Sequence, residues 1–130
     1  MVNSQMAHVY KNQQIMTSSP QQLTLLLYNG ALRFLTESIS ALEQGDVQKS
    51  HNANLRVQDI IREFVLTLDR SYEISTTCAQ LYEYTEHCLI QGNIKKDVKQ
   101  LQQAKSMLEE MRDAWIEAMK LTHVARAVGK

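Results

Sequence analysis

The chain has 130 residues, which suits one domain built around a single sizeable core. Lysine plus arginine and aspartate plus glutamate each total 14, so the net charge of zero gives no bias toward nucleic acid or an anionic membrane surface. There are only 4 glycines and 1 proline. Because both residue types interrupt helices, their scarcity after Pro20 predicts one helix after another.

The sequence also predicts the compartment. Its first residues lack the continuous apolar stretch of a secretory signal, and no segment approaches the roughly 20 apolar residues of a membrane span. Cys78 and Cys88 fall in one predicted helix, about 15 Å apart at the helical rise, which is too far for a disulfide. Free thiols without an export signal indicate a cytoplasmic protein that does not insert into membranes.

The first predicted helix follows a polar leader, residues 1–18. Ser19 is a suitable N-cap, and Pro20 fits the first helical position, where its missing N–H leaves no hydrogen bond unmade. The apolar spacing continues to about residue 44, and Gly45 suits the left-handed position that ends many helices. We therefore expect a helix over 20–44.

Three more helices follow from apolar residues spaced three and four apart. Asp46 is the expected N-cap of the second helix, Gly92 the expected end of the third, and Asn93 the expected N-cap of the fourth. A tail of uncertain order follows. The expected ranges are 47–68, 75–91 and 94–119 for the helices and 120–130 for the tail.

Short connections between amphipathic helices favour antiparallel neighbours that pack near +20°. The predicted fold is therefore all-α, an antiparallel four-helix bundle over residues 19–119. Trp115 lies in the middle of the apolar stripe of the fourth helix, so we expect it in the core.

Catalytic groupings are missing from the sequence. The four histidines lie in separate segments, whereas a di-iron bundle needs Glu-x-x-His motifs on two helices. The glycines are isolated, so none forms a phosphate-binding loop. Cys78 and Cys88 fall on an apolar stripe, where free cysteine acts as a small hydrophobic residue. The sequence thus predicts no enzyme, no catalytic residue, no metal and no cofactor.

The helices carry more apolar surface than a small bundle needs. The apolar arc of the first helix covers about 200°, wider than the stripe of a helix with one polar face. Leu66 points into a charged face of the second helix, and Tyr84 lies beside the main stripe of the third. Such a surplus, with tyrosines included, favours a groove that receives a peptide helix.

Several of these residues form a recognisable pattern. Ser19-Pro20, then Leu27-Tyr28-Asn29-Gly30-Ala31 and Phe34, resemble the first helix of the flagellar secretion chaperone FliS family. The resemblance covers roughly residues 8–119, with departures at Thr85 and Gly92. Its later parts are Gln58-Asp59-Ile60-Ile61, Leu81-Tyr82-Glu83-Tyr84 and Arg112-Asp113-Ala114-Trp115.

The resemblance implies a cytosolic export chaperone that binds the disordered C-terminal region of flagellin. Such a protein prevents premature polymerisation and assists delivery to the flagellar export apparatus, with components of the export gate as further candidate partners. The residues implied in partner binding are Tyr10, Tyr28, Asn29, Asp59, Ile60, Leu66, Ile74, Tyr82 and Tyr84.

Two other functions and two states of the leader stay open at this point. The bundle is alternatively a helical adaptor that self-associates through its extra apolar stripes, or a histidine phosphotransfer bundle that uses His51. Apolar residues of the leader recur at helical spacing, which favours a short lid over an empty groove. A disordered chain end is the alternative.

Overall fold

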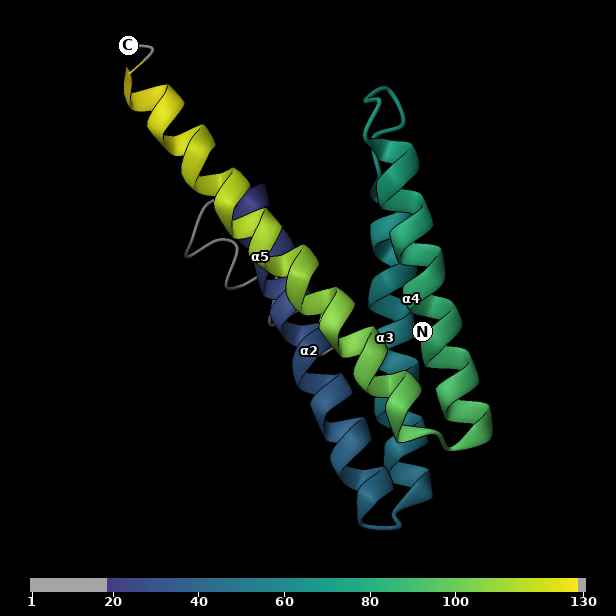
Figure 1. Cartoon of the computed structure of the whole chain (residues 1–130). Helices are drawn as coiled ribbons and strands as arrows, with labels where there is room; N and C mark the ends of the chain where they lie inside the picture. Colours follow the sequence, from purple (N-terminus) through teal and green to yellow (C-terminus); the bar gives the residue numbers. More distant parts are fainter. Residues whose placement is uncertain (1–18, 129–130) are drawn as a thin grey trace.

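The computed structural model describes residues 19–128, and the side chains among them as far as residue 121. The described chain contains four helices and no strand (Figure 1). These helices are α2 (Pro20–Glu43), α3 (Val47–Thr67), α4 (Ser75–Lys95) and α5 (Val98–Val128). The predicted all-α class is therefore confirmed. The leader and its predicted lid lie outside the described residues.

The four helices form an antiparallel bundle. Helix α2 packs against α3 and α5, and α4 packs against the same two helices. The helices therefore surround one core in chain order, and the diagonal pairs are α2 with α4 and α3 with α5. This arrangement confirms the predicted four-helix architecture.

The two halves of the bundle diverge toward one end (Figure 1). The pair α2–α5 and the pair α3–α4 lie together near the turns at 44–46 and 96–97, and separate toward the connection at 68–74. Helix α5 also continues past the start of α2. We call the separated region the open end; it comprises the start of α2, the end of α3, the start of α4 and the part of α5 that lies beside the start of α2.

Two predicted N-caps are confirmed. Ser19 has an extended backbone, and its hydroxyl accepts a hydrogen bond from the Gln22 amide at 3.1 Å. The Asp46 carboxylate accepts one from the Lys49 amide, also at 3.1 Å. Each cap satisfies an amide that has no partner within its own helix.

The ends of α2 and α4 differ in how well the sequence predicted them. Helix α2 ends at Glu43, and Gly45 has the expected left-handed backbone with φ 81°. The third helix does not end at Gly92, as expected, but continues to Lys95. Lys96, with φ 54°, takes the left-handed position instead.

Gly92 has a different role, because it lets α4 and α5 approach closely. A Cβ atom at this position would lie 2.7 Å from Cδ2 of Leu101. Asn93 is likewise not an N-cap, since it lies inside α4. The fourth helix begins at Val98, and the preceding Asp97 accepts a hydrogen bond from the Lys99 amide at 3.0 Å.

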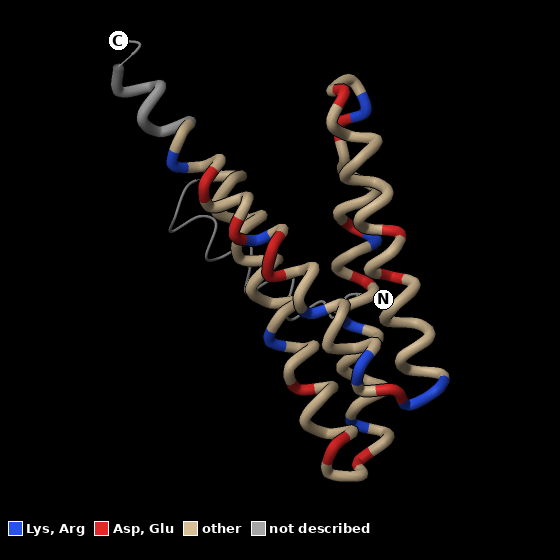
Figure 2. The backbone as a smooth tube through the Cα atoms, in the orientation of Figure 1, with Lys and Arg blue, Asp and Glu red and all other residues tan. Residues whose placement is uncertain are grey.

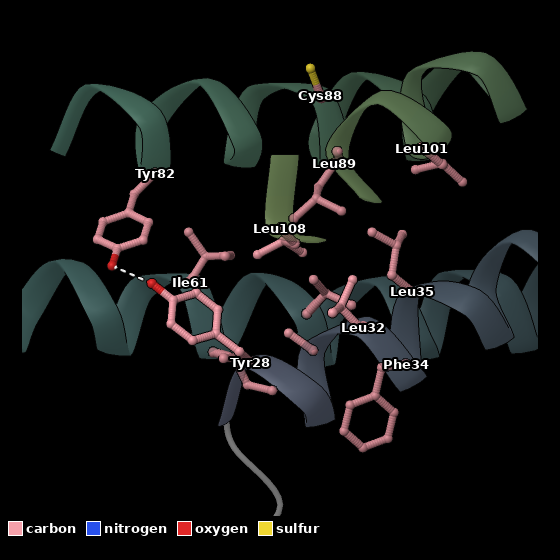
Figure 3. Close-up of a cluster of buried hydrophobic side chains, with 14 of the residues drawn as sticks. Tyr28, Leu32, Phe34, Leu35, Ile61, Tyr82, Cys88, Leu89, Leu101 and Leu108 are labelled. Atoms are coloured by element: carbon pink, nitrogen blue, oxygen red, sulfur yellow. Dashed lines mark hydrogen bonds between the residues drawn. The ribbon is translucent and has the colours of Figure 1, made fainter. Parts of the chain in front are cut away.

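The core runs along the bundle axis and is filled by aliphatic side chains (Figure 3). Two polar residues that interrupt the apolar stripe of α3, Ser50 and Asn54, are also buried. The Asn54 amide donates to the Leu89 carbonyl at 3.1 Å, and Ser38 Oγ donates to the Ser50 carbonyl at 2.8 Å. Because these groups have partners, their burial carries no unpaired-group penalty and fixes the register of α3 against α2 and α4.

Candidate partner-binding surfaces

Three aromatic rings fill the bundle where its halves begin to separate. Tyr28 of α2 and Tyr82 of α4 join hydroxyl to hydroxyl at 3.0 Å, across the diagonal of the bundle (Figure 3). Phe64 of α3 lies with them, with ring centroids 4.6 Å from Tyr28 and 5.5 Å from Tyr82. All three rings are buried. They form a floor beneath the open end.

The two hydroxyls stay neutral in this setting. Burial raises the pKa of the Tyr28 phenol far above its ordinary value, and the hydrogen bond with Tyr82 raises it further. Burial also raises the pKa of Tyr82. A neutral pair, in which each hydroxyl has a partner, suits a low-dielectric interior better than a phenolate would.

Half-buried apolar side chains surround this aromatic floor. They come from all four helices, and they pack against the core without being covered by it. Trp115 is one of them, and its indole N–H donates to the Gln21 carbonyl at 3.1 Å. The expected core position of Trp115 is therefore only partly correct, because the ring lies at the margin of the core. We call these residues the apolar cluster; Leu27, Met111 and Trp115 lie on the α2–α5 side, and Val65, Leu68 and Cys78 lie on the α3–α4 side.

The start of α2 extends this apolar region. Residues 20–32 carry no charge, and Leu23, Leu25 and Leu26 are all half-buried. Figure 2 shows that acidic and basic residues are otherwise interspersed along the helices. The wide apolar arc predicted from the sequence therefore corresponds to a real uncharged surface at the open end.

A groove lies between α3 and α4, close to the open end. Its volume is about 340 Å³, and it is lined by Arg62, Val65, Leu66, Tyr82, Glu83 and Glu86. The Arg62 guanidinium pairs with the Glu86 carboxylate at 3.1 Å. The Leu66 side chain is 80% exposed at the rim. The groove thus combines an apolar rim with a charged pair, which suits an amphipathic segment.

The connection between α3 and α4 adds two more exposed apolar side chains, Tyr72 and Ile74. The turn is organised by Asp69, whose carboxylate accepts hydrogen bonds from the hydroxyl and the amide of Ser71 at 2.6 and 2.9 Å. These hydrogen bonds lower the pKa of Asp69. Ile74 is 68% exposed at the start of α4, so it extends the apolar surface beyond the groove.

Tyr84 belongs to a different face from Leu66. Its hydroxyl accepts a hydrogen bond from the Gln103 amide of α5 at 2.8 Å, so it faces the α4–α5 seam. Its ring stacks on His87 with centroids 6.4 Å apart, and 45% of the residue is exposed. A partner that touches both Leu66 and Tyr84 must therefore wrap around α4.

The remaining candidates differ in accessibility. Asn29 is exposed on α2, Asp59 is half-buried on α3, and Ile60 is buried in the core. Tyr10 lies outside the described residues. Tyr28, Ile60 and Tyr82 have little surface to offer while the bundle stays closed, so their partner-binding role remains a prediction.

The candidate binding residues named from the sequence left out two parts of this surface. Tyr72 was not among the candidates, although its place in a short polar connection signals exposure of an aromatic ring. Leu25 and Leu26 were not among them either. Their position inside the wide apolar arc of the first helix was the signal that could have identified them.

Among the side chains that the structure describes, those of residues 19–121, no group of histidine, cysteine, aspartate and glutamate could hold a metal ion. Cys78 and Cys88 are free thiols. His51 Nδ1 lies 2.9 Å from the Asn93 amide nitrogen, in a structural contact between α3 and α4. Within the described part of the chain, no helix is long and apolar enough to cross a membrane.

Comparison with known proteins identifies the family of the chain. The sequence profile described as Flagellar protein FliS matches residues 1–122. The flagellar secretion chaperone FliS of Bacillus subtilis (strain 168) is 34% identical over 110 residues, covering 85% of this chain and 83% of the relative. That of Salmonella typhimurium is 30% identical over 112 residues, covering 84% and 83%. The chain therefore belongs to the FliS family.

Proposed function

We propose that this chain is a cytosolic export chaperone that binds the disordered C-terminal region of flagellin. It thereby prevents premature polymerisation and assists delivery to the export apparatus, without catalysing a reaction. Family membership supports the flagellar role. The observation that supports peptide binding is the apolar open end, where side chains from four helices pack on the core but remain partly exposed.

The open end suits a helical segment of the partner. A flagellin terminus that lacks its neighbouring subunits leaves its apolar stripe in water, and ordering it against the cluster of Leu27, Met111 and Trp115 buries that stripe. Coupled folding of this kind buries on the order of 1,000–3,000 Å² and costs about 2–5 kcal/mol in ordering. The resulting affinity is compatible with later release.

The α3–α4 groove suits a second segment of the same partner. Leu66 presents an exposed apolar side chain beside the Arg62–Glu86 pair, so an amphipathic segment gains an apolar contact and a polar one there. From Leu66 the partner would pass Ile74 at the start of α4. Contact with Tyr84 then requires it to continue around α4 toward α5.

The leader is a natural competitor for the open end. Residues 1–18 join the bundle at Ser19, and Trp115 contacts the following turn of chain at Gln21. We propose that the leader, including Tyr10, covers apolar surface until flagellin displaces it. In this role, the leader lowers the apparent affinity in proportion to the fraction of molecules that are open.

Calorimetry with three flagellin forms tests the proposal. Full-length flagellin and a form lacking its N-terminal region should bind with a negative heat-capacity change, because apolar surface leaves water. A form lacking the C-terminal region should not bind. Equal binding of the C-terminally truncated form would contradict the assignment. Light scattering of the free protein tests the alternative. A stable oligomer that does not bind flagellin would favour the self-associating adaptor.

A further inference from the structure

Phe34 lies under two arginine side chains on the outer side of the α2–α3 pair. The guanidinium carbon of Arg33 is 5.7 Å from the centre of the ring, and that of Arg56 is 5.3 Å from it. Figure 3 shows the ring pointing away from the other labelled core side chains. Phe34 is only 8% exposed, whereas both arginines are exposed. The arginines thus form the surface here and the ring forms its base.

Both guanidinium groups keep hydrogen-bonding capacity. Among the described residues, neither Arg33 nor Arg56 takes part in an ion pair or a side-chain hydrogen bond. An aromatic face attracts a guanidinium cation but accepts few of its five N–H groups. Two positive charges therefore share one ring, with most of their donors directed to solvent.

A polar hollow continues this surface along α2 and α3. Its volume is about 370 Å³, and Arg56 is one of its lining residues. The hollow differs from the open end, because its walls are polar and its side chains partly tied: Asp46 caps α3, and the Gln48 amide donates to Asn52 at 3.0 Å. The other lining residues are Glu37, Lys49 and Ala53.

We propose that Arg33 and Arg56 form a docking site for an acidic peptide segment of a second protein. Charge complementarity selects the occupant, since guanidinium groups bind carboxylates through paired N–H donors. Stacking on Phe34 holds both arginines in place before binding, so less side-chain freedom is lost on contact. The hollow beside Arg56 accommodates polar residues next to the carboxylate.

The charges nearby favour a peptide over a nucleic acid or an anionic membrane. Acidic and basic residues alternate along the bundle, with no extended basic region among the residues that the structure describes (Figure 2). Glu37 and Asp46 also line the adjacent hollow, and they would repel a run of phosphates. A pair of arginines between such carboxylates suits one or two side-chain carboxylates and not a continuous polyanion.

The position of this site lets both partners bind together, a feature that rests on the proposed function. Arg33 and Arg56 lie near the middle of α2 and α3, and the hollow continues from Arg56 toward the turn at 44–46, whereas the apolar cluster lies nearer the open end. Flagellin on the open end would leave Arg33 and Arg56 free. The acidic segment would then belong to a protein that receives the loaded chaperone.

Titration of the full chain with a short peptide that carries two glutamates among glycines and serines, followed by nitrogen-15 NMR, tests the site. We expect the Nε–H signals of Arg33 and Arg56 and the amide signals around Phe34 to shift together and saturate. Changing Arg33→Gln with Arg56→Gln should weaken binding about tenfold, because two solvent-exposed charge pairs together contribute a factor of about that size. The matched control, Lys95→Gln with Lys99→Gln, removes the same charge from exposed positions of α4 and α5 and should bind normally.

The conservative pair Arg33→Lys with Arg56→Lys keeps the charge and should still weaken binding, since lysine cannot bind a carboxylate through two parallel N–H groups. Shifts spread equally over Lys95, Lys96 and Lys99 would overturn the site, as would equal binding of the same peptide with glutamine in place of both glutamates. Each variant is also titrated with the flagellin C-terminal fragment. Normal flagellin binding with no peptide binding at the arginines refutes this inference alone, whereas loss of flagellin binding by the unmodified chain refutes the proposed function.

Discussion

At the scale of single residues, the Tyr28–Tyr82 hydroxyl pair ties α2 to α4 across the bundle. Tyr28→Phe or Tyr82→Phe alone leaves the other buried hydroxyl unpaired, so each should lower the free energy of unfolding by about 1–3 kcal/mol. The double change removes both polar groups and should cost less than the sum of the single changes. Urea unfolding of the four proteins measures this cycle; strict additivity would mean that the hydroxyls do not interact.

The pH dependence of unfolding provides a second test with the same variants. Burial raises the pKa of both phenols, so in the folded state they stay protonated above the ordinary value of 10.0, where the unfolded chain ionises. The stability that these groups contribute is therefore present below pH 10 and is lost as the pH rises further. The double Phe variant should lose less stability above that pH than the unmodified chain.

Leu66 offers the sharpest test of the α3–α4 groove. Because the side chain is 80% exposed, Leu66→Glu should leave the free energy of unfolding almost unchanged, within about 0.5 kcal/mol. The change should weaken flagellin binding, since it places a charge at an apolar rim that already carries Glu83 and Glu86. Calorimetry with the C-terminal flagellin fragment measures the effect.

Leu55 provides the matched control on the same helix. It is 42% exposed and does not line the groove, so Leu55→Glu should bind flagellin normally. Equal weakening by the two changes would show a general charge effect. Normal binding by Leu66→Glu would exclude the groove as a flagellin contact.

For single residues, the sequence predicted which side chains break the pattern of a helix face better than it predicted which side chains are buried. The sequence correctly marked Leu66 as an apolar residue in a polar face, because the helical period alone reveals such a mismatch. It could not separate Tyr28 and Tyr82 from exposed tyrosines, since their burial depends on Phe64 of α3 lying against both rings. Long-range contacts of this kind leave no trace in local spacing.

At the scale of the elements, two turns use the same left-handed backbone with different residues. Gly45 adopts φ 81°, and a Cβ atom added there would meet nothing within 4 Å, so Gly45→Ala should cost about 1 kcal/mol through backbone strain alone. Lys96 adopts φ 54°, so Lys96→Gly should raise the free energy of unfolding, by up to about 1 kcal/mol. Thermal unfolding measures both. Changes of equal sign would contradict the assignment of strain to these turns.

The α4–α5 turn shows why helix ends were harder to predict than helix centres. Gly92 has the residue type of a helix stop, yet it is needed inside α4 because Leu101 occupies the space that a Cβ atom would take. Lys96 adopts the left-handed backbone instead, and lysine is not a residue type that predicts this conformation. Asp46 and Ser19 were predictable, since an N-cap side chain bonds to its own helix and depends on no distant contact.

At the scale of the whole molecule, the divergence of the two helix pairs creates the candidate site. The heptad pattern predicted four packed helices and did not predict where they separate. Trp115, the single tryptophan of the chain, is half-buried on the α2–α5 side of this region, where its indole N–H bonds to the Gln21 carbonyl. Its emission therefore reports directly on whatever covers the open end.

Removal of residues 1–16 tests the leader as a lid on this surface. If the leader competes with flagellin, the truncated protein should bind the C-terminal fragment more tightly, by the reciprocal of the open fraction. Its Trp115 emission should shift to the red in the free state, because water reaches the ring. The free truncated protein should also self-associate, since an uncovered apolar patch promotes contact between copies. Titration calorimetry, fluorescence and light scattering measure these three effects.

Tyr10→Ala separates covering from contact, because it removes one aromatic side chain and keeps the length of the leader. If Tyr10 only helps to close the lid, Tyr10→Ala should resemble the truncation in weaker form, with modestly tighter binding and a partial red shift. If Tyr10 also touches bound flagellin, the variant should show the red shift together with weaker binding. Weaker binding by both proteins, with unchanged Trp115 emission and no self-association, would make the leader a contact element that does not cover the open end.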